Sequence, residues 1–292
     1  MNILTFDIEE WYLEKMYFGD HAEKYKEFDR YLGEILDTLD ERNLKGTFFC
    51  VGGLGREFPD VVKRIADRGH DVGCHSDVHT WLNKMTREEC LADTRMAVDS
   101  LEQVIGKKVK SYRAPAFSIG ASNKWAFEVL AECGIERDAS VFPAVRDFGG
   151  FAEFGQKTPA IIKYNGTELK EFPICTAKLM GKEIAYSGGG YFRFFPLWYV
   201  KKEMASADYS MTYFHIEDLL SIKGDFMTKE LYEEYFGEKG TLKARVVRHI
   251  KTNLGKKTAF AKLKNLIKNT DFCSLEYADQ LIDWSSKPIV EI

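Results

Sequence analysis

Residues 72–82 read VGCHSDVHTWL and place two of the chain's six histidines four residues apart, directly after an apolar run. The run is a strand candidate, so His75 and His79 would follow the carboxyl end of a strand. On a helical turn this spacing puts both imidazoles on one face, where they could share a cation. Histidine pairs with this spacing are also common surface features, so the rest of the sequence must decide.

The composition indicates a folded protein with a large core. The 292 residues are 45% hydrophobic and 14% aromatic, which argues against intrinsic disorder. A net charge of -4 gives no overall attraction to nucleic acid, and we expect no such partner. The six cysteines are scattered without a CxxC pair, which favours reduced thiols over a disulfide framework.

The N-terminal stretch MNILTFDIEEWY passes directly from a short apolar run to acidic residues. It has no basic start, no long apolar region and no small-residue cleavage site of the kind found in signal peptides. No stretch of the chain approaches the roughly 18 apolar residues that span a bilayer. We therefore expect a cytoplasmic protein, with peripheral contact to the inner membrane face as an additional hypothesis.

Strand-like and helix-like segments alternate through the first two-thirds of the chain. NILTF, KGTFFCVG and HDVGCHS are strand candidates, and helical patterns separate them. The clearest helix, TREECLADTRMAVDSLEQVIG, starts with a capping box formed by Thr86 and Glu89 and stops at Gly106. This alternation predicts an α/β fold of parallel strands covered by helices, either as a barrel or as an open sheet.

The alternation breaks after about residue 145. Asn165 and Gly166 stand between two alternating runs, which is the strongest short-range signal for a β-hairpin. We predict a single domain over residues 1–292. It would have a core over residues 1–220, an inserted hairpin, and a C-terminal helical extension over residues 221–292.

A basic segment occupies residues 243–268 of this extension. No acidic residue occurs between Gly240 and Asp271, and the apolar residues recur at roughly helical spacing. The pattern is typical of a terminal helix with a solvated basic face. The alternative is a surface that contacts anionic lipid headgroups or a phosphorylated substrate.

Ionisable residues follow most strand candidates of the α/β half. Ligands in such folds gather at the carboxyl ends of the strands, so these residues should meet at one mouth. They are Asp7, Glu9, Glu10, His75, Asp77, His79, Arg113, Asp138, His215, Glu217 and Asp218. Glu9 or Asp7 could add a carboxylate to the histidine pair, giving three protein ligands and room for water, as in a catalytic zinc site.

Four motifs resemble those of one known family and occur in its order. TFDIEE resembles the TFDD motif of the polysaccharide deacetylase family, also called the NodB-homology or carbohydrate esterase family 4 group. HSDVH is similar to its H-[ST]-x-x-H motif, RAPAF to its R-x-P motif, and YFHIED to its late strand ending in histidine. The segments around RAPAF resemble a subgroup tied to surface-glycan synthesis. The resemblance covers residues 3–218 and implies a distorted (β/α)7 barrel.

The resemblance also implies metal-dependent removal of an N-acetyl group from a sugar. Residue by residue, it makes His75 and His79 metal ligands and Asp7 the general base. Arg113 would orient that base, and His215 would be the general acid that protonates the departing amine.

Two positions depart from the family pattern. Thr80 stands where the family has a proline after the second histidine, which should affect the turn more than the ligation. Ile8 stands where the family has its third ligand, an Asp directly after the base, and an alkyl side chain cannot bind a metal. Glu9 is the replacement that we expect, because two residues along a strand return a side chain to the face of Asp7. This corresponds to a D-x-E variant of the first motif, and Glu10 remains the alternative.

Four further residues complete the predicted site. Asp138 is expected either to orient Arg113 or His215 in catalysis, or to cap a turn. Trp11 and Tyr191 are candidates for walls that stack on a sugar. Pro115 marks a turn whose following backbone N–H could hold the oxyanion, and Tyr191 is the alternative for that role.

The sequence therefore predicts a hydrolase with one divalent metal ion, zinc first and cobalt or nickel as alternatives. Its expected substrate is an N-acetylated sugar in a polysaccharide or glycan precursor that is nucleotide-linked, lipid-linked or free. Two rivals stay open. One hydrolyses non-sugar amides, as allantoinase-like relatives do, and the other is a catalytically inactive carbohydrate-binding relative. The identity of the sugar and the oligomeric state are not predicted.

Overall fold

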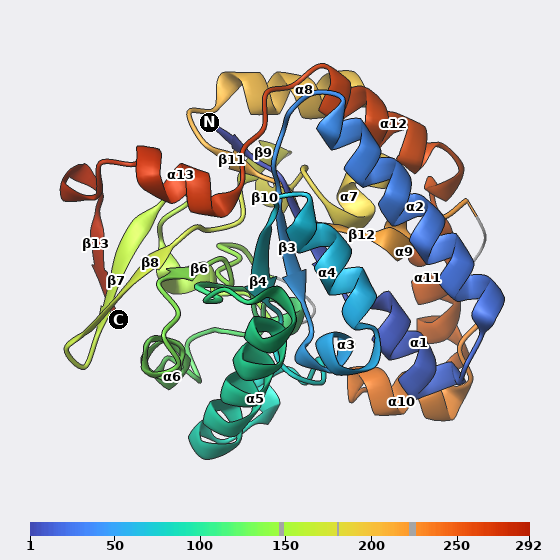
Figure 1. Cartoon of the computed structure of the whole chain (residues 1–292), viewed down its shortest axis with the longest axis horizontal. Coiled ribbons are helices and arrows are strands. Elements are labelled where there is room, and N and C mark those ends of the chain that lie inside the picture. The colour runs from blue at the N-terminus through green and yellow to red at the C-terminus, as the bar shows by residue number, and fades with distance from the viewer. Residues whose placement is uncertain (146–148, 180, 222–225) are drawn as a thin grey trace.

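The fold is built on one large sheet with helices packed around it (Figure 1). The structure is a computed structural model that describes residues 1–145, 149–179, 181–221 and 226–292. Nine strands form the sheet in the order β12-β2-β3-β4-β5-β6-β8-β7-β13. All neighbours in it run parallel except β7 and β8. The α/β class with a parallel sheet is thereby confirmed.

The strands are mostly short. They comprise β1 (Asn2–Ile3), β2 (Thr5–Ile8), β3 (Thr47–Cys50), β4 (Asp71–Cys74), β5 (Ser111–Tyr112), β6 (Arg137–Asp138), β7 (Ala160–Tyr164), β8 (Thr167–Glu171), β9 (Thr176–Leu179), β10 (Lys182–Ala185), β11 (Ser210–Met211), β12 (Phe214–His215) and β13 (Ile289–Glu291). β1 pairs with β11, and β9 pairs with β10 in a separate hairpin.

The helices follow the strands along the chain. They comprise α1 (Glu10–Phe18), α2 (Ala22–Asp40), α3 (Gly52–Glu57), α4 (Pro59–Asp67), α5 (Arg87–Ile105), α6 (Trp125–Glu132), α7 (Gly189–Phe194), α8 (Leu197–Ser206), α9 (Ile216–Leu219), α10 (Lys229–Phe236), α11 (Leu242–Asn253), α12 (Lys256–Lys268) and α13 (Leu275–Leu281). None of the helices that the structure describes is both long and apolar enough to cross a bilayer.

The parallel sheet curves as a barrel would, but its hydrogen-bonded ladder does not close within the described residues. Other contacts bridge the gap between the segment after β8 and the segment before β12. The Tyr209 hydroxyl donates to the Pro173 carbonyl at 2.8 Å, and Cys175 Sγ lies 3.2 Å from the Met211 carbonyl. The expected (β/α)7 barrel is therefore realised as an open, distorted one.

Local signals placed two features correctly. Thr86 Oγ1 accepts from the Glu89 N–H while the Glu89 carboxylate accepts from the Thr86 N–H, which is the predicted capping box of α5. Asn165 and Gly166 have φ of 48° and 84°, as the tight turn between β7 and β8 requires. The hairpin is part of the main sheet, because β8 pairs with β6.

The basic segment forms two helices rather than the single helix that its periodicity suggested. Gly255 has φ of 78° and separates α11 from α12. A Cβ at this position would lie 2.6 Å from the Arg193 carbonyl oxygen, so the break needs glycine. α12 buries four apolar residues against the core, namely Ala259, Leu263, Leu266 and Ile267.

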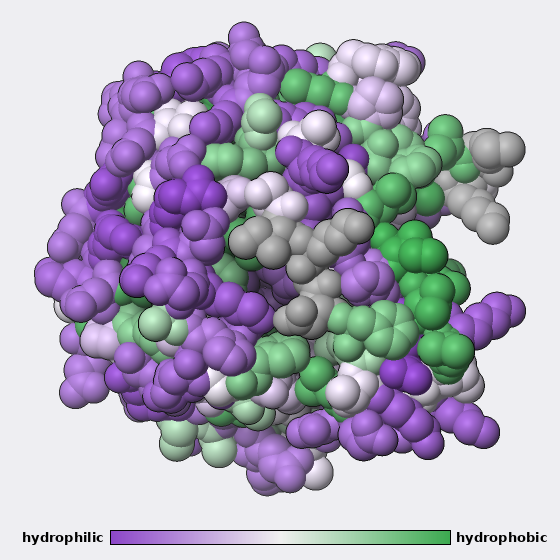
Figure 2. Space-filling view, turned by 90° about the vertical axis from the view of Figure 1, so that its right-hand side faces the viewer, coloured by the Kyte–Doolittle hydropathy of each residue, from purple (hydrophilic) through white to green (hydrophobic). Residues whose placement is uncertain are grey.

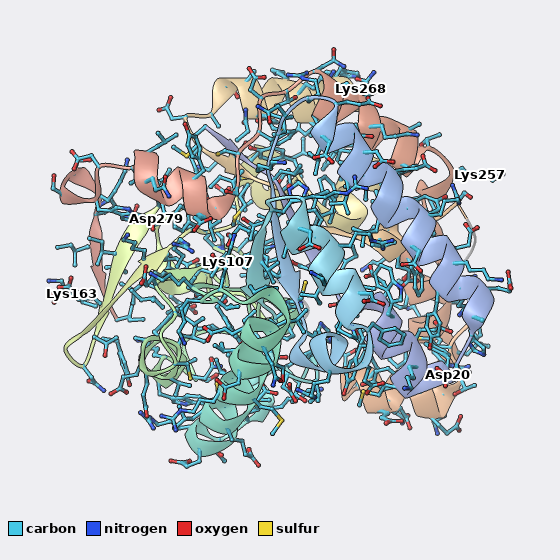
Figure 3. The ribbon with its side chains drawn as sticks, in the orientation of Figure 1. Asp20, Lys107, Lys163, Lys257, Lys268 and Asp279 are labelled. Carbon is cyan, nitrogen blue, oxygen red and sulfur yellow. The ribbon has the colours of Figure 1, made fainter. Side chains whose placement is uncertain are left out.

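The surface carries charged side chains over most of its area. Lys257 and Lys268 point outward from α12 (Figure 3). The face that contains α11 also shows a band of hydrophobic side chains (Figure 2).

The buried His70 should make stability fall in mild acid. Its Nδ1 accepts from the Gly46 N–H, and burial with the nearby Lys45 charge lowers its pKa from 6.5 to about 4. In the unfolded chain, this imidazole becomes protonated below about pH 6.5, whereas in the native state it stays neutral down to about pH 4. The free energy of unfolding therefore decreases as the pH falls from about 6.5 to about 4.

His70→Asn keeps an acceptor for Gly46 and removes the titration. Between about pH 7 and about pH 5, the variant should lose roughly 1–2 kcal/mol less unfolding free energy than wild type in urea titrations. Any fixed packing cost of the substitution cancels in this comparison across pH. Equal losses in both proteins would show that His70 does not contribute.

Candidate metal centre

The proposed site lies at the carboxyl ends of three strands of the sheet, β12, β2 and β4. β2 carries Asp7 and leads into Glu9, β4 leads into His75, and β12 ends at His215. β12 pairs with β2 so that His215 lies opposite Asp7. Parallel pairing from β12 to β4 thus brings the predicted residues to one edge of the sheet, as expected for an α/β fold.

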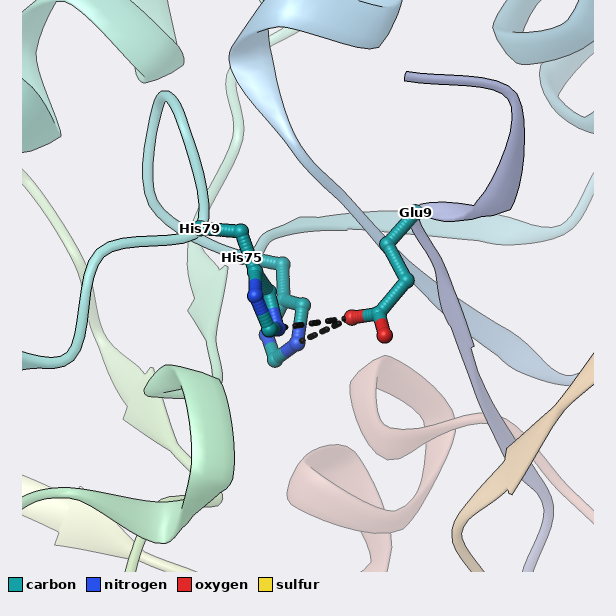
Figure 4. A group of neighbouring side chains, drawn as sticks. All are labelled: Glu9, His75 and His79. Carbon is teal, nitrogen blue, oxygen red and sulfur yellow. Dashed lines mark ion pairs between the residues drawn. The ribbon is translucent and has the colours of Figure 1, made fainter. Parts of the chain in front are cut away.

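Glu9, His75 and His79 form a compact group of three candidate ligands (Figure 4). Glu9 Oε2 lies 2.8 Å from His79 Nε2 and 3.3 Å from His75 Nε2. One ligand atom from each residue lies within 4.8 Å of the other two, and His75 and Glu9 are buried. Two imidazoles and a carboxylate converging on one point are a ligand set suited to zinc, and they leave a further position open.

The two histidines converge for a reason that differs from the predicted one. Residues 75–79 form a turn in which Ser76 and His79 have φ of 61° and 62°, so the helical-turn interpretation was wrong. The imidazole centroids nevertheless lie 5.2 Å apart. His75 Nδ1 lies 2.7 Å from the Arg113 carbonyl oxygen, which turns Nε2 toward Glu9. Such a carbonyl partner commonly fixes a metal-ligating histidine.

Electrostatics supports a charged carboxylate in this group. Burial opposes ionisation of Glu9, but three neighbouring histidines together hold its pKa well below the usual range. Glu10 differs, because burial and the charge of Glu9 raise its pKa to about 8. Its carboxyl accepts from the backbone N–H groups of Glu9 and Glu217 and lies outside the three-residue group. The structure therefore favours Glu9 over Glu10 as the third ligand.

The predicted base is held by a buried ion pair. Arg113 Nη1 donates to Asp7 Oδ1 at 2.8 Å and to Thr5 Oγ1 at 2.7 Å, and Arg113 Nε donates to the Ala139 carbonyl. Arg113 is 0% exposed and Asp7 is 2% exposed. The guanidinium is a matched partner for the buried carboxylate at Oδ1, and the second oxygen, Oδ2, remains available.

That second oxygen faces the predicted acid. His215 Nε2 lies 3.8 Å from Asp7 Oδ2 and 3.8 Å from Glu9 Oε1. On the other side of the ring, His215 Nδ1 lies 3.1 Å from Asp218 Oδ2. The imidazole therefore spans from an orienting carboxylate to the three-residue group.

Sequence reasoning did not assign roles to Asp218 and Arg193. Asp218 lies three residues after His215 at the start of α9, a local signal that could have identified it. Arg193 comes from α7, contacts Asp218 and also donates to the carbonyls of Leu254 and Lys251. No local sequence pattern relates Arg193 to His215, so only the fold reveals it.

Asp138 does not hold Arg113 or His215 as predicted. It contacts the Ser140 hydroxyl and lies opposite Glu171 on the neighbouring strand. Burial raises the pKa of Asp138 to about 6, and burial with the charge of Asp138 raises that of Glu171 well above its usual range. Asp138 is therefore buried in the sheet beside a second carboxyl, which gives it a structural environment.

The predicted substrate-binding residues lie in three different settings. Trp11 is 1% exposed and packs edge-on against Phe28, so its indole belongs to the core. Pro115 begins a buried turn in which Ala116 and Phe117 both have positive φ, 53° and 54°. Strained turns of this kind cluster at functional sites. Tyr191 is 40% exposed on α7 and does not line the cavity described next.

A cavity of about 570 Å³ extends from Glu9 and His215. It passes between α1 on one side and α10 and α11 on the other. Its aromatic lining comprises Tyr17, Phe18, Phe28, Tyr232, Tyr235 and Phe236. Charged side chains from α1, α2, α9 and α11 line it as well, so the cavity offers aromatic surface and polar groups to a small organic ligand.

Comparison with known proteins agrees with this geometry. Residues 3–137 match the family model described as polysaccharide deacetylase, which includes Asp7, Glu9, both ligand histidines and Arg113. The N-terminal part of the chain, residues 3–137, is thus similar to the polysaccharide deacetylase family. Residues 139–279 match a second model, described as a domain of unknown function (DUF3473). The two models meet at β6, inside the sheet.

The polysaccharide deacetylase match is supported by individual relatives. A peptidoglycan-N-acetylglucosamine deacetylase of Bacillus cereus is 33% identical over 107 residues, which are 37% of this chain and 39% of that protein. One from Listeria monocytogenes is 44% identical over 101 residues, 35% of this chain and 20% of that protein. The chain thus spans two-fifths or less of the length of these two curated relatives.

Solved structures support the fold. A Mycobacterium smegmatis protein named for the polysaccharide deacetylase family matches with a TM-score of 0.65 and 16% identity, covering 100% of this chain and 92% of that one. A 4-alpha-glucanotransferase from Thermococcus litoralis matches with a TM-score of 0.59 and 14% identity, covering 100% of this chain and 42% of that one. Because the second protein has a different activity, the fold alone does not determine the reaction.

Metal content should separate the two candidate carboxylates. Glu9→Gln removes the charged member of the three-residue group, so dialysed protein should lose about one equivalent of zinc relative to wild type, measured by elemental analysis. Glu10→Gln is the matched control. It keeps an acceptor for the same backbone donors and should retain the metal. Loss of zinc from Glu10→Gln alone would reverse the assignment.

Proposed function

We propose that this chain is a polysaccharide deacetylase family member, a metal-dependent hydrolase that removes the N-acetyl group of an amino sugar in a polysaccharide or glycan precursor. One observation carries the proposal: a base held by Arg113, an acid held by Asp218 and a zinc-type ligand group all face one point. The names of the curated relatives, which act on N-acetylated peptidoglycan sugars, support the same reaction class.

Hydrolysis of an amide bond needs an electrophilic metal, a general base and a general acid, and we assign residues to each of these roles. When bound by Glu9, His75 and His79, a divalent ion supplies Lewis-acid polarisation of the carbonyl and acidifies water. We favour zinc because of the two imidazoles and one carboxylate, with cobalt or nickel as alternatives. The rest of the chemistry belongs to the side chains around this group.

Asp7 acts as the general base. Because Arg113 occupies Oδ1 of Asp7, Oδ2 is the atom that accepts a proton from the attacking water. The water oxygen bonds to the amide carbon as this proton leaves. His215 acts as the general acid. Asp218 stabilises the protonated ring at Nδ1, and Nε2–H passes its proton to the nitrogen as the C–N bond breaks. The products are acetate and a free amino sugar.

Two rival functions are distinguished from the proposed one in different ways. A catalytically inactive relative would lack a ligand at Ile8, but Glu9 supplies a carboxylate to the histidines. A hydrolase of non-sugar amides would use the same machinery. Acetate release from N-acetylhexosamine substrates, compared with release of ammonia or carboxylate from ureide and cyclic amide substrates, separates this rival from the proposed function.

Loss of the base should affect turnover and leave metal binding intact. Asp7→Asn preserves the hydrogen bond to Arg113 but cannot accept a proton, so kcat for acetate release should fall by about 10²–10⁴. Zinc content and thermal melting measured on the same sample show that the site and the fold survive. Near-normal turnover in a fully metallated variant would contradict the role of Asp7.

Asp218 should act through His215 rather than on the substrate. Asp218→Asn removes the charge that stabilises the imidazole, so we expect kcat to drop by roughly 10–100-fold with little change in KM. Asp29→Asn is a suitable control, because Asp29 pairs with Arg64 at the surface and is not part of the His215 contacts. A rise in KM without a fall in kcat would assign Asp218 to substrate binding.

The cellular location and the carrier of the sugar are further parts of this proposal. We propose a cytoplasmic enzyme that acts on a nucleotide-linked, lipid-linked or free precursor and touches the inner membrane face through residues 243–268. All six cysteines are free thiols in the structure, which supports a reducing compartment. Of the three precursor forms, we favour the lipid-linked one, for the reasons given in the next subsection.

A further inference from the structure

α11 is amphipathic in the reverse sense to an ordinary surface helix. None of its residues is buried, and its apolar side points to solvent. We call this side the outer face. It consists of Leu242, Val246, Val247, Ile250 and Leu254, which are 65%, 39%, 43%, 57% and 52% exposed. With 3.6 residues per turn, these positions fall on one side of the helix.

The opposite side of α11 is polar and faces into the molecule. This inner face consists of Arg245, Arg248, His249 and Thr252, all of which line the cavity that begins at Glu9. Arg245 Nη1 donates to the Met227 carbonyl at 3.1 Å. Its Nε is buried and has no acceptor among the described residues. A buried guanidinium N–H without an acceptor can donate a hydrogen bond to an anionic ligand.

The outer face continues onto neighbouring elements. Phe194 of α7 and Trp198 of α8 are 65% and 68% exposed. Arg193 of α7 donates to the carbonyls of Lys251 and Leu254, so α7 lies against the C-terminal end of α11. Figure 2 shows hydrophobic side chains gathered on the side of the molecule where Figure 1 places α11. A patch of this kind marks a contact site.

The charges around the patch indicate what it contacts. No acidic residue occurs from position 241 to position 270, while Lys243, Lys251 and Lys257 are exposed. Lysine is depleted in protein–protein interfaces, which disfavours a second copy of the chain as the occupant. Exposed Leu, Ile, Phe and Trp together with Lys are typical of a helix that lies in the surface of an anionic bilayer.

We propose that α11 stands between an anionic bilayer and the catalytic cavity, with its outer face in the lipid surface and its inner face holding the phosphate of a lipid-linked N-acetylamino sugar. This inference rests on the proposed function and selects its substrate class. The phosphate is a diester or diphosphate that joins the sugar to an apolar chain. Arginine is suited to it because the planar guanidinium binds phosphate oxygens in pairs.

The cavity extends from the site proposed for the acetamido group, at Glu9, to the site proposed for the phosphate, at α11. Tyr235 lines it together with Glu9 of the three-residue group and with Arg245 and Arg248 of the inner face. The cationic inner face and a member of the three-residue group therefore open onto the same cavity. A sugar beside Tyr235 would have its acetamido group toward Glu9 and its phosphate toward α11.

The first experiment tests the outer face. Full-length protein is co-sedimented with vesicles of phosphatidylcholine alone and of phosphatidylcholine mixed with phosphatidylglycerol. We expect partitioning at least about tenfold stronger on the anionic vesicles, weakened by salt. Val246→Asp with Ile250→Asp should abolish this preference. Met96→Asp, at an equally exposed apolar site on α5, should partition as wild type.

Two results would overturn the membrane half of the proposal. One is absence of partitioning by wild type, and the other is unchanged partitioning by the double aspartate variant. Sedimentation velocity distinguishes the main rival occupant. A wild-type dimer that dissociates in the double variant, without vesicle binding by either, would make the outer face a contact between two copies.

The second experiment tests the inner face by calorimetric binding in the Asp7→Asn background, where turnover is slow. The probes are a short-chain prenyl diphosphate N-acetylglucosamine and octyl N-acetylglucosaminide, which lacks phosphate. Arg245→Gln can still donate to Met227, and it should weaken binding of the phosphate probe by roughly tenfold or more while the neutral probe changes much less. Equal weakening of both probes would overturn the phosphate subsite.

Failure of this inference is separable from failure of the proposed function. Acetate release from the neutral probe without vesicle partitioning would retain the deacetylase and remove the membrane role. Vesicle partitioning and phosphate-dependent binding without acetate release from either probe would retain the docking surface and remove the deacetylase.

Discussion

The buried pair between Arg113 and Asp7 is the constraint on which the site depends. A guanidinium with no solvent exposure is tolerated only if every charge and donor around it is matched. Arg113 meets this demand by contacting Asp7 and Thr5 on β2 and the Ala139 carbonyl after β6. Its own carbonyl oxygen holds His75. One residue thus fixes the base, a candidate metal ligand and the relative positions of three strands.

The C-terminal half of the chain contributes side chains to this site. The match to a domain of unknown function begins after β6 and includes His215, Asp218 and Arg193. Arg193 ties the carboxylate behind His215 to the end of α11. Contacts therefore link the proposed acid and its orienting group to the cavity wall, so a function for this region is best sought in substrate recognition beside the candidate metal group.

Local chemistry explains which features the sequence could predict. The Thr86 capping box and the turn at Asn165 depend on a few adjacent residues, and both were found. Glu9 was identified because strand alternation returns it to the side of Asp7. Asp138 was misassigned because its partner, Glu171, is a neighbour only across the sheet. The periodicity of α11 marked a helix, but which side faces solvent depends on how α1 and α10 enclose the cavity.

Zinc-edge anomalous diffraction from crystals of the wild-type protein grown with zinc is the most direct test of the central claim. The account predicts one strong anomalous peak per chain, bonded to Nε2 of His75, Nε2 of His79 and a carboxylate oxygen of Glu9, with Asp7 beside it and not coordinated. An empty three-residue group, or a peak coordinated without Glu9, would contradict it.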